Sequence, residues 1–291
     1  KLNTQTNDVR NRDVLDAFVR FGAPEEVGYL GKPHVGSDNL KKVVANIRAY
    51  IQEHGGEFRF SEQLTDVRIR DGRLAEIVTT RGSEPCDELV LAVGHSARDT
   101  FEMLLSRGFV IEQKEFAVGV RMEHLQEKIG RAQYGAGYAA LPPADYKLVS
   151  HASDRGVFTF CMCPGGVVIP AASEEGGVVT NGMSDFARAG RNANSALVVQ
   201  VFRSDFGSEH PLAGVQFQRK LERAAFAAAG GGYRAPVQLV GDFLADKESY
   251  YFGEVRPTYA PGTAFVPMQA IFPRAVTDAM KAALPDMNAR L

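Results

Sequence analysis

The sequence predicts an α/β fold class. An α/β part is expected first and a mostly β part after it, so the chain as a whole is α+β. Two observations support this class. Up to residue 108, segments with helical spacing alternate with short apolar runs typical of strands. After residue 108, short strand-like segments follow one another and are joined by glycine-rich turns. A chain of 291 residues can bury a large core and form one large or two smaller domains.

Two helices are predicted in the first 55 residues. Asn11 can cap the first helix, which has one apolar face and is stopped by the segment ending at Pro24. Ser37 or Asp38 can cap the second, in which apolar residues recur at helical spacing as far as Ile51. Two glycines, at 55 and 56, then end this helix.

Two strands with a hairpin between them are predicted next. Phe58 to Phe60 is a short strand, and the five apolar residues from Leu89 to Val93 suit a parallel strand covered on both faces. Between them, residues 64–70 and 74–80 alternate apolar and polar side chains around an Asp71-Gly72 turn, which predicts a β-hairpin.

The stretch ELVLAVGHSARDT, residues 88–100, organises this part of the chain. A buried strand leads into Gly94, and Ser96 can cap a helix over residues 97–106. Such a turn is where α/β folds hold anionic cofactors, because glycine lets the backbone approach a ligand closely. An ordinary strand–turn–helix explains the same local pattern without a ligand.

The rest of the chain is predicted to be mostly β. Its predicted strands are residues 116–122, 146–152, 157–163, 167–171, 178–183, 196–202 and 236–244. Its predicted helices are residues 125–132, 216–229 and 274–284, and residues 250–267 read as an extended segment rich in proline and aromatics.

Composition excludes several classes of protein. A net charge of −2 gives no reason to expect nucleic acid or an acidic membrane as a partner. No apolar run approaches the roughly 20 residues that span a bilayer. The three cysteines lack the spacing of a disulfide framework, and together with the absence of a signal peptide this favours the cytoplasm. No cysteine or histidine pairing predicts a metal site.

Five segments in order carry a resemblance to a known family: GKPHVGSDNL, LVLAVGHSARDTFEML, FCMCPGG, EEGGVVTNGMS and GRNANSA. They look like large bacterial FAD-dependent dehydrogenases of unestablished substrate, relatives of the glutathione-reductase-type flavoproteins. The resemblance implies a partial, Rossmann-like, three-layer FAD-binding unit with a β-meander, plus an inserted mostly-β substrate domain. It also implies flavin-mediated hydride transfer to or from a small molecule.

The sequence departs from this family in two respects, one of which is that it shows no C-terminal glycine-rich segment of the kind that lies beside the flavin in such proteins. Such proteins hold the FAD pyrophosphate on an N-terminal GxGxxG turn, and no GxGxxG occurs here. We therefore interpret the chain as an internal fragment whose parent binds FAD, and we expect no FAD on the fragment itself. Its expected parts are the later FAD domain (1–108), an inserted substrate or cap domain (109–245), and a return segment with a terminal helix (246–291).

Four residues are candidate cofactor contacts through the resemblance. Leu64 begins the first meander strand, where such flavoproteins pair backbone atoms with the adenine edge. Val93, Gly94 and His95 would lie along the cofactor in the parent. Core packing explains Leu64 equally well, and a lone histidine at a turn is more often structural.

The candidate substrate residues lie in two turn-rich loops and one strand. Lys32 and His34 precede a helix N-terminus, which favours anions, and His34 is the candidate proton-transfer residue. Arg191 can bind a carboxylate through two hydrogen bonds, and Arg121 is a further anion contact. Asn192 and Asn194 complete the predicted glycine-flanked loop. We expect both loops to reach one cleft. Surface loops stabilised by local caps explain these residues without function.

Cys161 and Cys163 are two apart on a predicted strand, which would place both thiols on one face. A redox role competes with simple burial, since free cysteine is often just a small apolar residue. Two function classes remain open at this point. The first is an FAD-dependent oxidoreductase, and the second is a non-catalytic substrate-recognition or interaction domain that is inactive alone.

Overall fold

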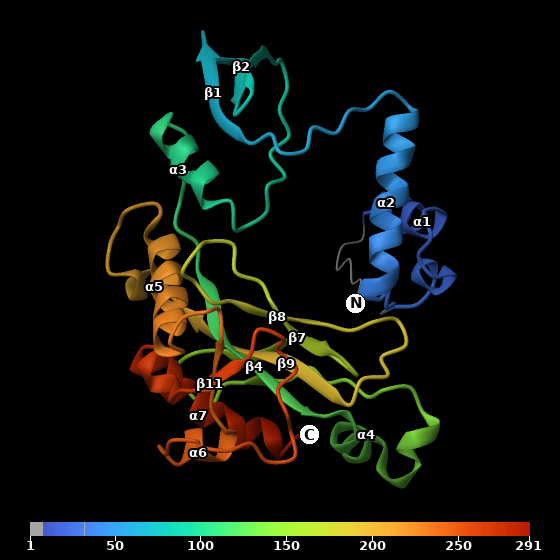
Figure 1. The fold of residues 1–291 in the computed structure, drawn as a ribbon, viewed down its shortest axis with the longest axis vertical. Helices are drawn as coiled ribbons and strands as arrows, with labels where there is room; N and C mark the ends of the chain where they lie inside the picture. Colours follow the sequence, from blue (N-terminus) through green and yellow to red (C-terminus); the bar gives the residue numbers. More distant parts are fainter. Residues whose placement is uncertain (1–7, 32) are drawn as a thin grey trace. The chain divides into compact units, whose positions relative to one another are not determined.

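The computed structural model describes residues 8–31 and 33–291. Helices and sheets are mixed along the chain, which confirms the predicted α/β class (Figure 1). The chain forms two compact units. Unit 1 consists of Lys1–His54, Phe116–Val201 and Leu221–Leu291, and unit 2 consists of Gly55–Glu115 and Phe202–Lys220. The functional boundaries that we placed at residues 108 and 245 stay a proposal.

A four-stranded antiparallel sheet forms the centre of unit 1. Its strands, in spatial order, are β4 (Phe116–Leu125), β9 (Asn192–Val201), β6 (Val157–Cys163) and β5 (Val149–Ser150). β4 and β9 are paired over their whole lengths. The period-2 pattern of β9 puts Leu197, Val199 and Val201 on one face, and all three are fully buried. The apolar run after Ala196 therefore forms the middle of the core.

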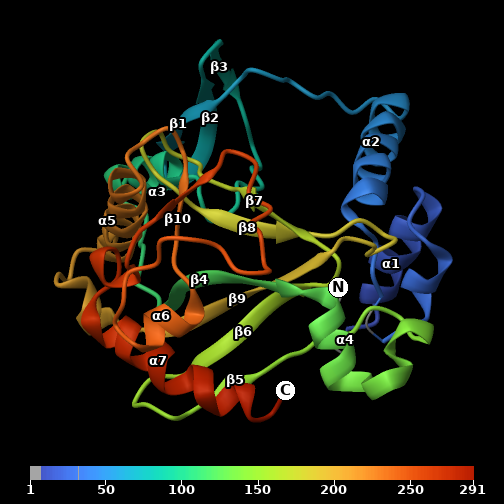
Figure 2. The same ribbon diagram turned by 60° about the horizontal axis from the view of Figure 1, so that its bottom comes forward.

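Other elements cover this sheet. Helix α7 (Arg274–Asn288) contacts β9, β6 and β5, and Ser150 donates a hydrogen bond to Asp286 of the helix. The antiparallel pair β7 (Val167–Pro170) and β8 (Thr180–Met183) contacts the central strands and lies on the other side of the sheet from α7 (Figure 2). The polar side chains of Arg121 and Asn194, which belong to the candidate site, lie between the sheet and this β7–β8 pair.

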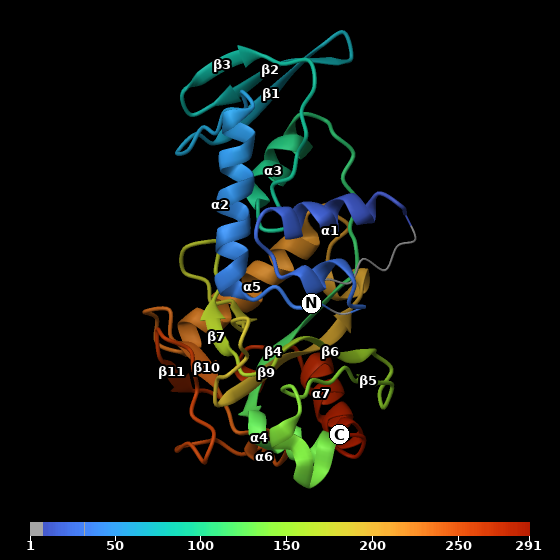
Figure 3. The same ribbon diagram turned by 90° about the vertical axis from the view of Figure 1, so that its right-hand side faces the viewer.

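The first 54 residues form a small helical layer of unit 1. It contains α1 (Asn11–Arg20), the 3₁₀ turn η1 (Glu25–Gly28) and α2 (Ser37–Glu53). Figure 3 shows α1 lying across α2. Val27 and Val43 are fully buried where these elements pack, surrounded by the apolar face that the helical spacing predicts. Both predicted helices are confirmed.

Further elements are α4 (Gln126–Tyr134), η2 (Gly135–Ala140), η3 (Arg203–Phe206), α5 (Ala213–Ala228), β10 (Ala235–Val237), α6 (Val240–Leu244), β11 (Thr263–Phe265) and η4 (Met268–Ala270). They lie in unit 1, except that η3 belongs to unit 2 and the residues of α5 are divided between the two units. The single strand predicted over residues 236–244 is wrong. Only its first residues pair, in parallel with β11, and the following residues turn into α6.

Unit 2 contains the predicted β-meander. β1 (Leu64–Arg70), β2 (Arg73–Thr79) and β3 (Gly82–Pro85) form an antiparallel sheet in that order. Asp71 and Gly72 both have positive φ, at 50° and 74°, as a two-residue hairpin turn requires. Helix α3 (Arg98–Ser106) follows, and an ion pair between Arg107 and Asp66 joins its end to β1.

The two predicted parallel strands of this part are not formed. Phe58–Phe60 and Leu89–Val93 have no strand partner within the described residues. The apolar run is not covered either, since Val90 is 88% exposed and Val93 is 45% exposed. A strand exists only through hydrogen bonds to a neighbour, so apolar character alone does not make one. The predicted three-layer arrangement is therefore absent from unit 2.

Candidate functional site

The loop before α2 is fastened to the loop after β8. Ser37 donates from its backbone N and its Oγ to the carbonyl of Ser184, at 3.1 and 3.2 Å. Asp38 Oδ1 accepts a hydrogen bond from the backbone N of Phe186 at 2.9 Å. Gly36, with φ of 83°, is required here because a Cβ would lie 2.4 Å from the Phe186 nitrogen. Two loops that are far apart in sequence thus make one rigid junction.

His34 belongs to this junction. Its Nε2 donates to the carbonyl of Asp185 at 3.0 Å, and its ring lies parallel to that of Phe186. Burial is the largest influence on the His34 pKa and lowers it, and the positive charge of Arg188 acts in the same direction. His34 is therefore held neutral, with Nδ1 left as the acceptor. Lys32, the other candidate in this loop, lies outside the described residues.

Arg188 lies in the same loop as Asp185 and Phe186, and the sequence did not single it out. Its backbone is in the left-handed region, with φ of 49°. Its Nε is buried and has no hydrogen-bond partner among the described residues. Burial lowers the pKa of this guanidinium, opposed by the charges of Glu26 and Cys163. Burying a cation even in part without a hydrogen-bonded counterion costs free energy. A hydrogen-bond acceptor at this position would therefore stabilise Arg188.

Arg121 and Asn194 lie together on neighbouring strands of the sheet. Arg121 Nε donates to Asn194 Oδ1, and its Nη2 donates to the carbonyl of Cys161, both at 2.8 Å. Nη2 also lies 3.4 Å from Cys163 Sγ. Asn194 is fully buried, and its Nδ2 has no partner in the described part of the chain. Gly182 makes room for this pair, since a Cβ there would approach the guanidinium to 2.0 Å.

Cys163 connects these two cations. It pairs with Asn194 across the ladder and contacts Arg121. The turn that follows Cys163 lies directly against the Arg188 loop, because there is no space for a Cβ on Gly165 between the two backbones. We call Arg121, Arg188, Asn194 and His34 the cationic cluster. All of its members lie in unit 1.

Asn192 and Glu123 form a second polar group on the same sheet face. Glu123 accepts hydrogen bonds from Thr258 Oγ1 at 2.7 Å and from Asn192 Nδ2 at 3.1 Å. Asn192 Nδ2 also donates to the carbonyl of Arg256 at 2.8 Å. Because these groups satisfy one another, their arrangement fixes strands and a loop.

The predicted loop over residues 190–195 is wrong in its structure. Asn192 and Asn194 are buried residues inside β9, and only Arg191 precedes the strand. The side chain of Arg191 is exposed, and its Nη2 is 3.4 Å from the carbonyl of Glu254. Arg121 and Asn194 are brought together, whereas His34 neighbours the loop of Arg188 and contacts Asp185 in it.

The candidate cofactor residues all lie in unit 2. Leu64 pairs with Thr79 at the start of β1. Val93, Gly94 and His95 are exposed, and Gly94 has φ of 76° with open space where a Cβ would be. His95 Nδ1 accepts a hydrogen bond from Ser96 Oγ at 3.0 Å. Gly94 thus has the left-handed turn that only glycine adopts easily.

His124 and Tyr146 form a buried pair on the opposite face of the sheet. Tyr146 Oη donates to His124 Nε2 at 2.6 Å. Burial lowers the pKa of His124 to about 4 and raises the pKa of Tyr146 to about 12. Both groups are therefore neutral at neutral pH, and they sit beside the cluster of Ile129 and Met162 in the core.

This pair predicts a loss of stability in mild acid. The unfolded His124 takes up a proton near pH 6.5, whereas the folded one stays neutral to about pH 4. Stability is therefore complete above pH 6.5 and falls as the pH is lowered, by about 2 kcal/mol between pH 6.5 and 5. Urea unfolding across this range measures the slope. His124→Gln is expected to flatten it more than His54→Gln, a matched change at an exposed histidine, and equal slopes would contradict the assignment.

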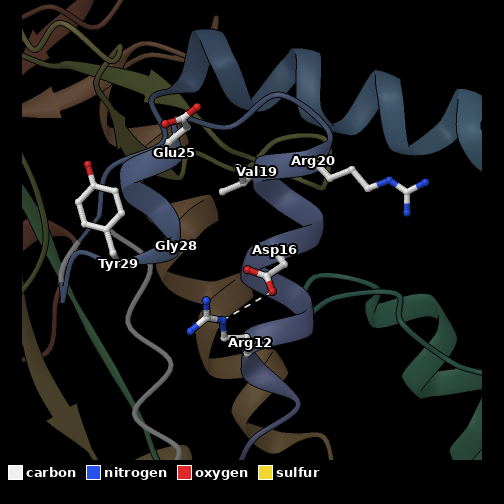
Figure 4. Close-up of a pocket in the computed structure, with 7 residues that line it drawn as sticks. All are labelled: Arg12, Asp16, Val19, Arg20, Glu25, Gly28 and Tyr29. Carbon is white, nitrogen blue, oxygen red and sulfur yellow. Dashed lines mark ion pairs between the residues drawn. The ribbon is translucent and has the colours of Figure 1, made fainter.

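A depression in the helical layer is the other notable surface feature. It has a volume of about 410 Å³ and is lined by Arg12, Asp16, Val19, Arg20, Glu25, Gly28 and Tyr29 (Figure 4). Arg12 and Asp16 are paired at 3.6 Å, and Tyr29 is 75% exposed. None of the residues predicted from the sequence lines it. Its charged groups are exposed or paired on the surface, so it does not carry the candidate site.

The described residues contain neither a candidate membrane span nor a candidate metal site. No helix in the described residues is both long enough and apolar enough to cross a bilayer. Within residues 8–31 and 33–291, no three His, Cys, Asp or Glu side chains gather in a way that could hold a metal ion.

Comparison with known proteins identifies the family. The family described as "FAD-dependent protein, C-terminal domain-like" matches residues 115–291, more than half of the chain. An uncharacterized protein of Clostridium beijerinckii is 48% identical over 295 residues, a similarity that covers 100% of this chain and 55% of the relative. The chain thus spans only about half of that relative's length. On this evidence, the chain belongs to the FAD-dependent protein, C-terminal domain-like family.

Proposed function

We propose that this chain is part of an FAD-dependent oxidoreductase and that its cationic cluster binds the substrate, a small carboxylate or similar anion. Family membership supports the flavin. The observation that carries the substrate class is the guanidinium of Arg188, which is half-buried and lacks a hydrogen-bonded carboxylate among the described residues. A buried donor such as its Nε is costly unless an acceptor satisfies it.

Asn194 and Arg121 add donors to the same site. Asn194 Nδ2 is buried and unpaired, and it cannot move away because β9 is paired on both sides. Arg121 uses Nε and Nη2 for protein contacts, which leaves Nη1 without an acceptor in the described part of the chain. A carboxylate accepts several hydrogen bonds at once, so it matches a set of fixed donors.

His34 is suited to move a proton at this site. Its Nε2 proton is donated to Asp185, so Nδ1 carries the lone pair. Because burial lowers its pKa, the ring is neutral and ready to accept a proton near neutral pH. We propose that His34 takes the proton lost when the substrate is oxidised.

The residues of this chain fit only part of an FAD site. Gly94 offers an open left-handed turn, and the apolar residues before it are exposed. No GxGxxG turn is present in the sequence to hold the pyrophosphate. We propose that further polypeptide, as in the longer relative, supplies the rest of the site.

Flavin content tests this proposal. We expect the 291-residue chain to purify without flavin absorbance bands. A longer protein that adds the remaining part of the relative is expected to purify yellow and to release FAD on heating. Stoichiometric FAD on the short chain would contradict the division of the site. A colourless long protein would favour the alternative, a recognition domain without catalysis.

Substrate binding is tested by comparing Arg188 with Arg191. With acetate, succinate and citrate as probes, we expect Arg188→Met to weaken the tightest binding about tenfold or more, the scale of one charged hydrogen bond. Arg191→Met, a change of the same size nearby, is expected to bind as the unaltered chain does. The reverse order would restore the sequence-based assignment to Arg191. Absence of binding to every probe in the unaltered chain would contradict the anion site.

Although Arg188→Met is expected to weaken anion binding, it is expected to raise stability. Arg188→Met removes a half-buried charge that has no hydrogen-bonded partner, so the ligand-free protein should gain about 1 kcal/mol. Chemical unfolding without added anions measures this change. If Arg188 serves anion binding at the expense of stability, the Arg188→Met variant binds anions more weakly and has a higher free energy of unfolding. Loss of both would instead identify Arg188 as a structural residue.

A further inference from the structure

Cys161 and Cys163 lie at a β-bulge. β6 and β9 pair Phe160 with Ala196 and then Cys163 with Asn194, so β6 contains one extra residue over this interval. Cys161 has φ of 48°, a left-handed conformation that is unusual for a residue with a side chain. The prediction that both thiols lie on one face assumed a regular strand, and the strand is not regular at these residues.

The Cys163 sulfur lies close to Cys161. In a flat strand, residues two apart have Cα atoms about 6.6–6.8 Å apart, at the upper limit of disulfide geometry. The Cys163 thiol interacts with the Cys161 side chain, and its Sγ lies 3.3 Å from the Cys161 carbonyl oxygen.

The two thiols have different surroundings. Cys161 is exposed, whereas Cys163 is 6% exposed and lies beside the Arg121 guanidinium. None of the three cysteines, all of them within the described residues, forms a disulfide in this structure. One thiol is thus accessible to a reagent, and the other is held next to it with a cation at hand.

We propose that Cys161 and Cys163 form a reversible disulfide by exchange with a small-molecule disulfide such as glutathione disulfide. The Cys161 thiolate attacks one sulfur of the reagent, forms a mixed disulfide and releases the first glutathione thiolate. The Cys163 thiolate then attacks Cys161 Sγ and expels the second. Two protein thiols are oxidised, one reagent disulfide is reduced to two thiols, and the two protons end on the released glutathione.

The order of attack follows from the neighbours of each sulfur. The hydrogen-bonded Cys161 thiol is the largest influence that raises the pKa of Cys163, followed by burial, so Cys163 is the poorer first nucleophile. Once Cys161 is in a mixed disulfide, its thiol no longer raises the Cys163 pKa. Arg121 then remains to stabilise the Cys163 thiolate.

Intact mass and thiol counting test the proposal in a Cys86→Ser background, which leaves only the two thiols in question. After incubation of the folded chain with glutathione disulfide, we expect a mass lower by two hydrogen atoms. After denaturation, we expect no thiol that reacts with a thiol reagent. Dithiothreitol should restore both thiols. A stable glutathione adduct with one remaining thiol, or two unreacted thiols, would overturn the proposal.

Two single variants separate the steps. With Cys163→Ser added, we expect the glutathione adduct to accumulate on Cys161, because no second thiol displaces it. With Cys161→Ser added, we expect modification at least tenfold slower, since Cys163 is buried. Circular dichroism of each variant checks that the fold is kept. Rapid modification of Cys163 in the absence of Cys161 would contradict the proposed order.

Discussion

Replacement of Gly165 by alanine is expected to destabilise unit 1 by about 2–5 kcal/mol. Gly165 has φ of 52°, and an added Cβ would lie 1.8 Å from the carbonyl oxygen of Arg188. The obstacle is backbone, so no rotamer change can relieve it. Gly190 also donates to the Gly165 carbonyl at 3.0 Å, which holds the two segments together. The turn after Cys163 and the loop of Arg188 must therefore separate before the methyl group fits.

Gly176→Ala is the matched control for this change. Gly176 has a similar φ of 73° but has nothing within 4 Å of the position of a Cβ. It should lose only the conformational part, about 1 kcal/mol. Denaturant unfolding of both variants measures the difference. If the two variants unfold at the same denaturant concentration, close approach at Gly165 is not what holds the loop. Gly165→Ala should also weaken anion binding, because it displaces Arg188.

The elements with a clear local pattern were predictable from the sequence. Helix α2 has apolar residues at regular helical spacing, and the β1–β2 hairpin has two strand-like segments on either side of the Asp71-Gly72 turn. Strand β6 has the predicted bounds, Val157 to Cys163. In these cases local propensity and tertiary packing favour the same conformation, which makes prediction reliable.

The failures have physical causes that no local pattern contains. Leu89 to Val93 has the composition of a buried strand, yet a strand also needs a partner, and none is present in the described residues. Asn192 and Asn194 read as loop residues because asparagine is depleted in strands. The polar interior of this sheet, with Glu123 and Arg121 as partners, reverses that preference.

The candidate site was predictable in residue type more than in position. Arg121 and Asn194 were chosen singly, and the structure places them in direct contact. Nothing in the sequence distinguishes Arg188 from Arg191, since both are arginines near glycines in one loop. The left-handed backbone of Arg188 and its contact with the turn at Gly165 direct it inward, and both are tertiary features.

Loss of the Glu123 carboxylate is the second large effect that we expect. Glu123→Ala should destabilise unit 1 by about 2–4 kcal/mol, because it leaves partly buried donors without an acceptor. Thr258 donates to Glu123 from both its backbone N and its Oγ1, at 3.2 and 2.7 Å. The same Oγ1 accepts a hydrogen bond from the Val168 nitrogen at 2.8 Å. Glu123 therefore connects β4 to β9, to the 256–258 segment and to β7.

Two further variants determine whether the cause is charge or hydrogen bonding. Glu123→Gln keeps one acceptor but turns an amide donor toward the donors of Thr258 and Asn192, so it should recover only part of the lost stability. Glu127→Ala removes a nearby carboxylate that pairs with Arg131 on the surface, and it should change the unfolding midpoint little. Urea unfolding ranks the three variants. Equal losses in Glu123→Ala and Glu127→Ala would show that the polar group around Glu123 does not hold these strands together, and that its carboxylate is available for another role.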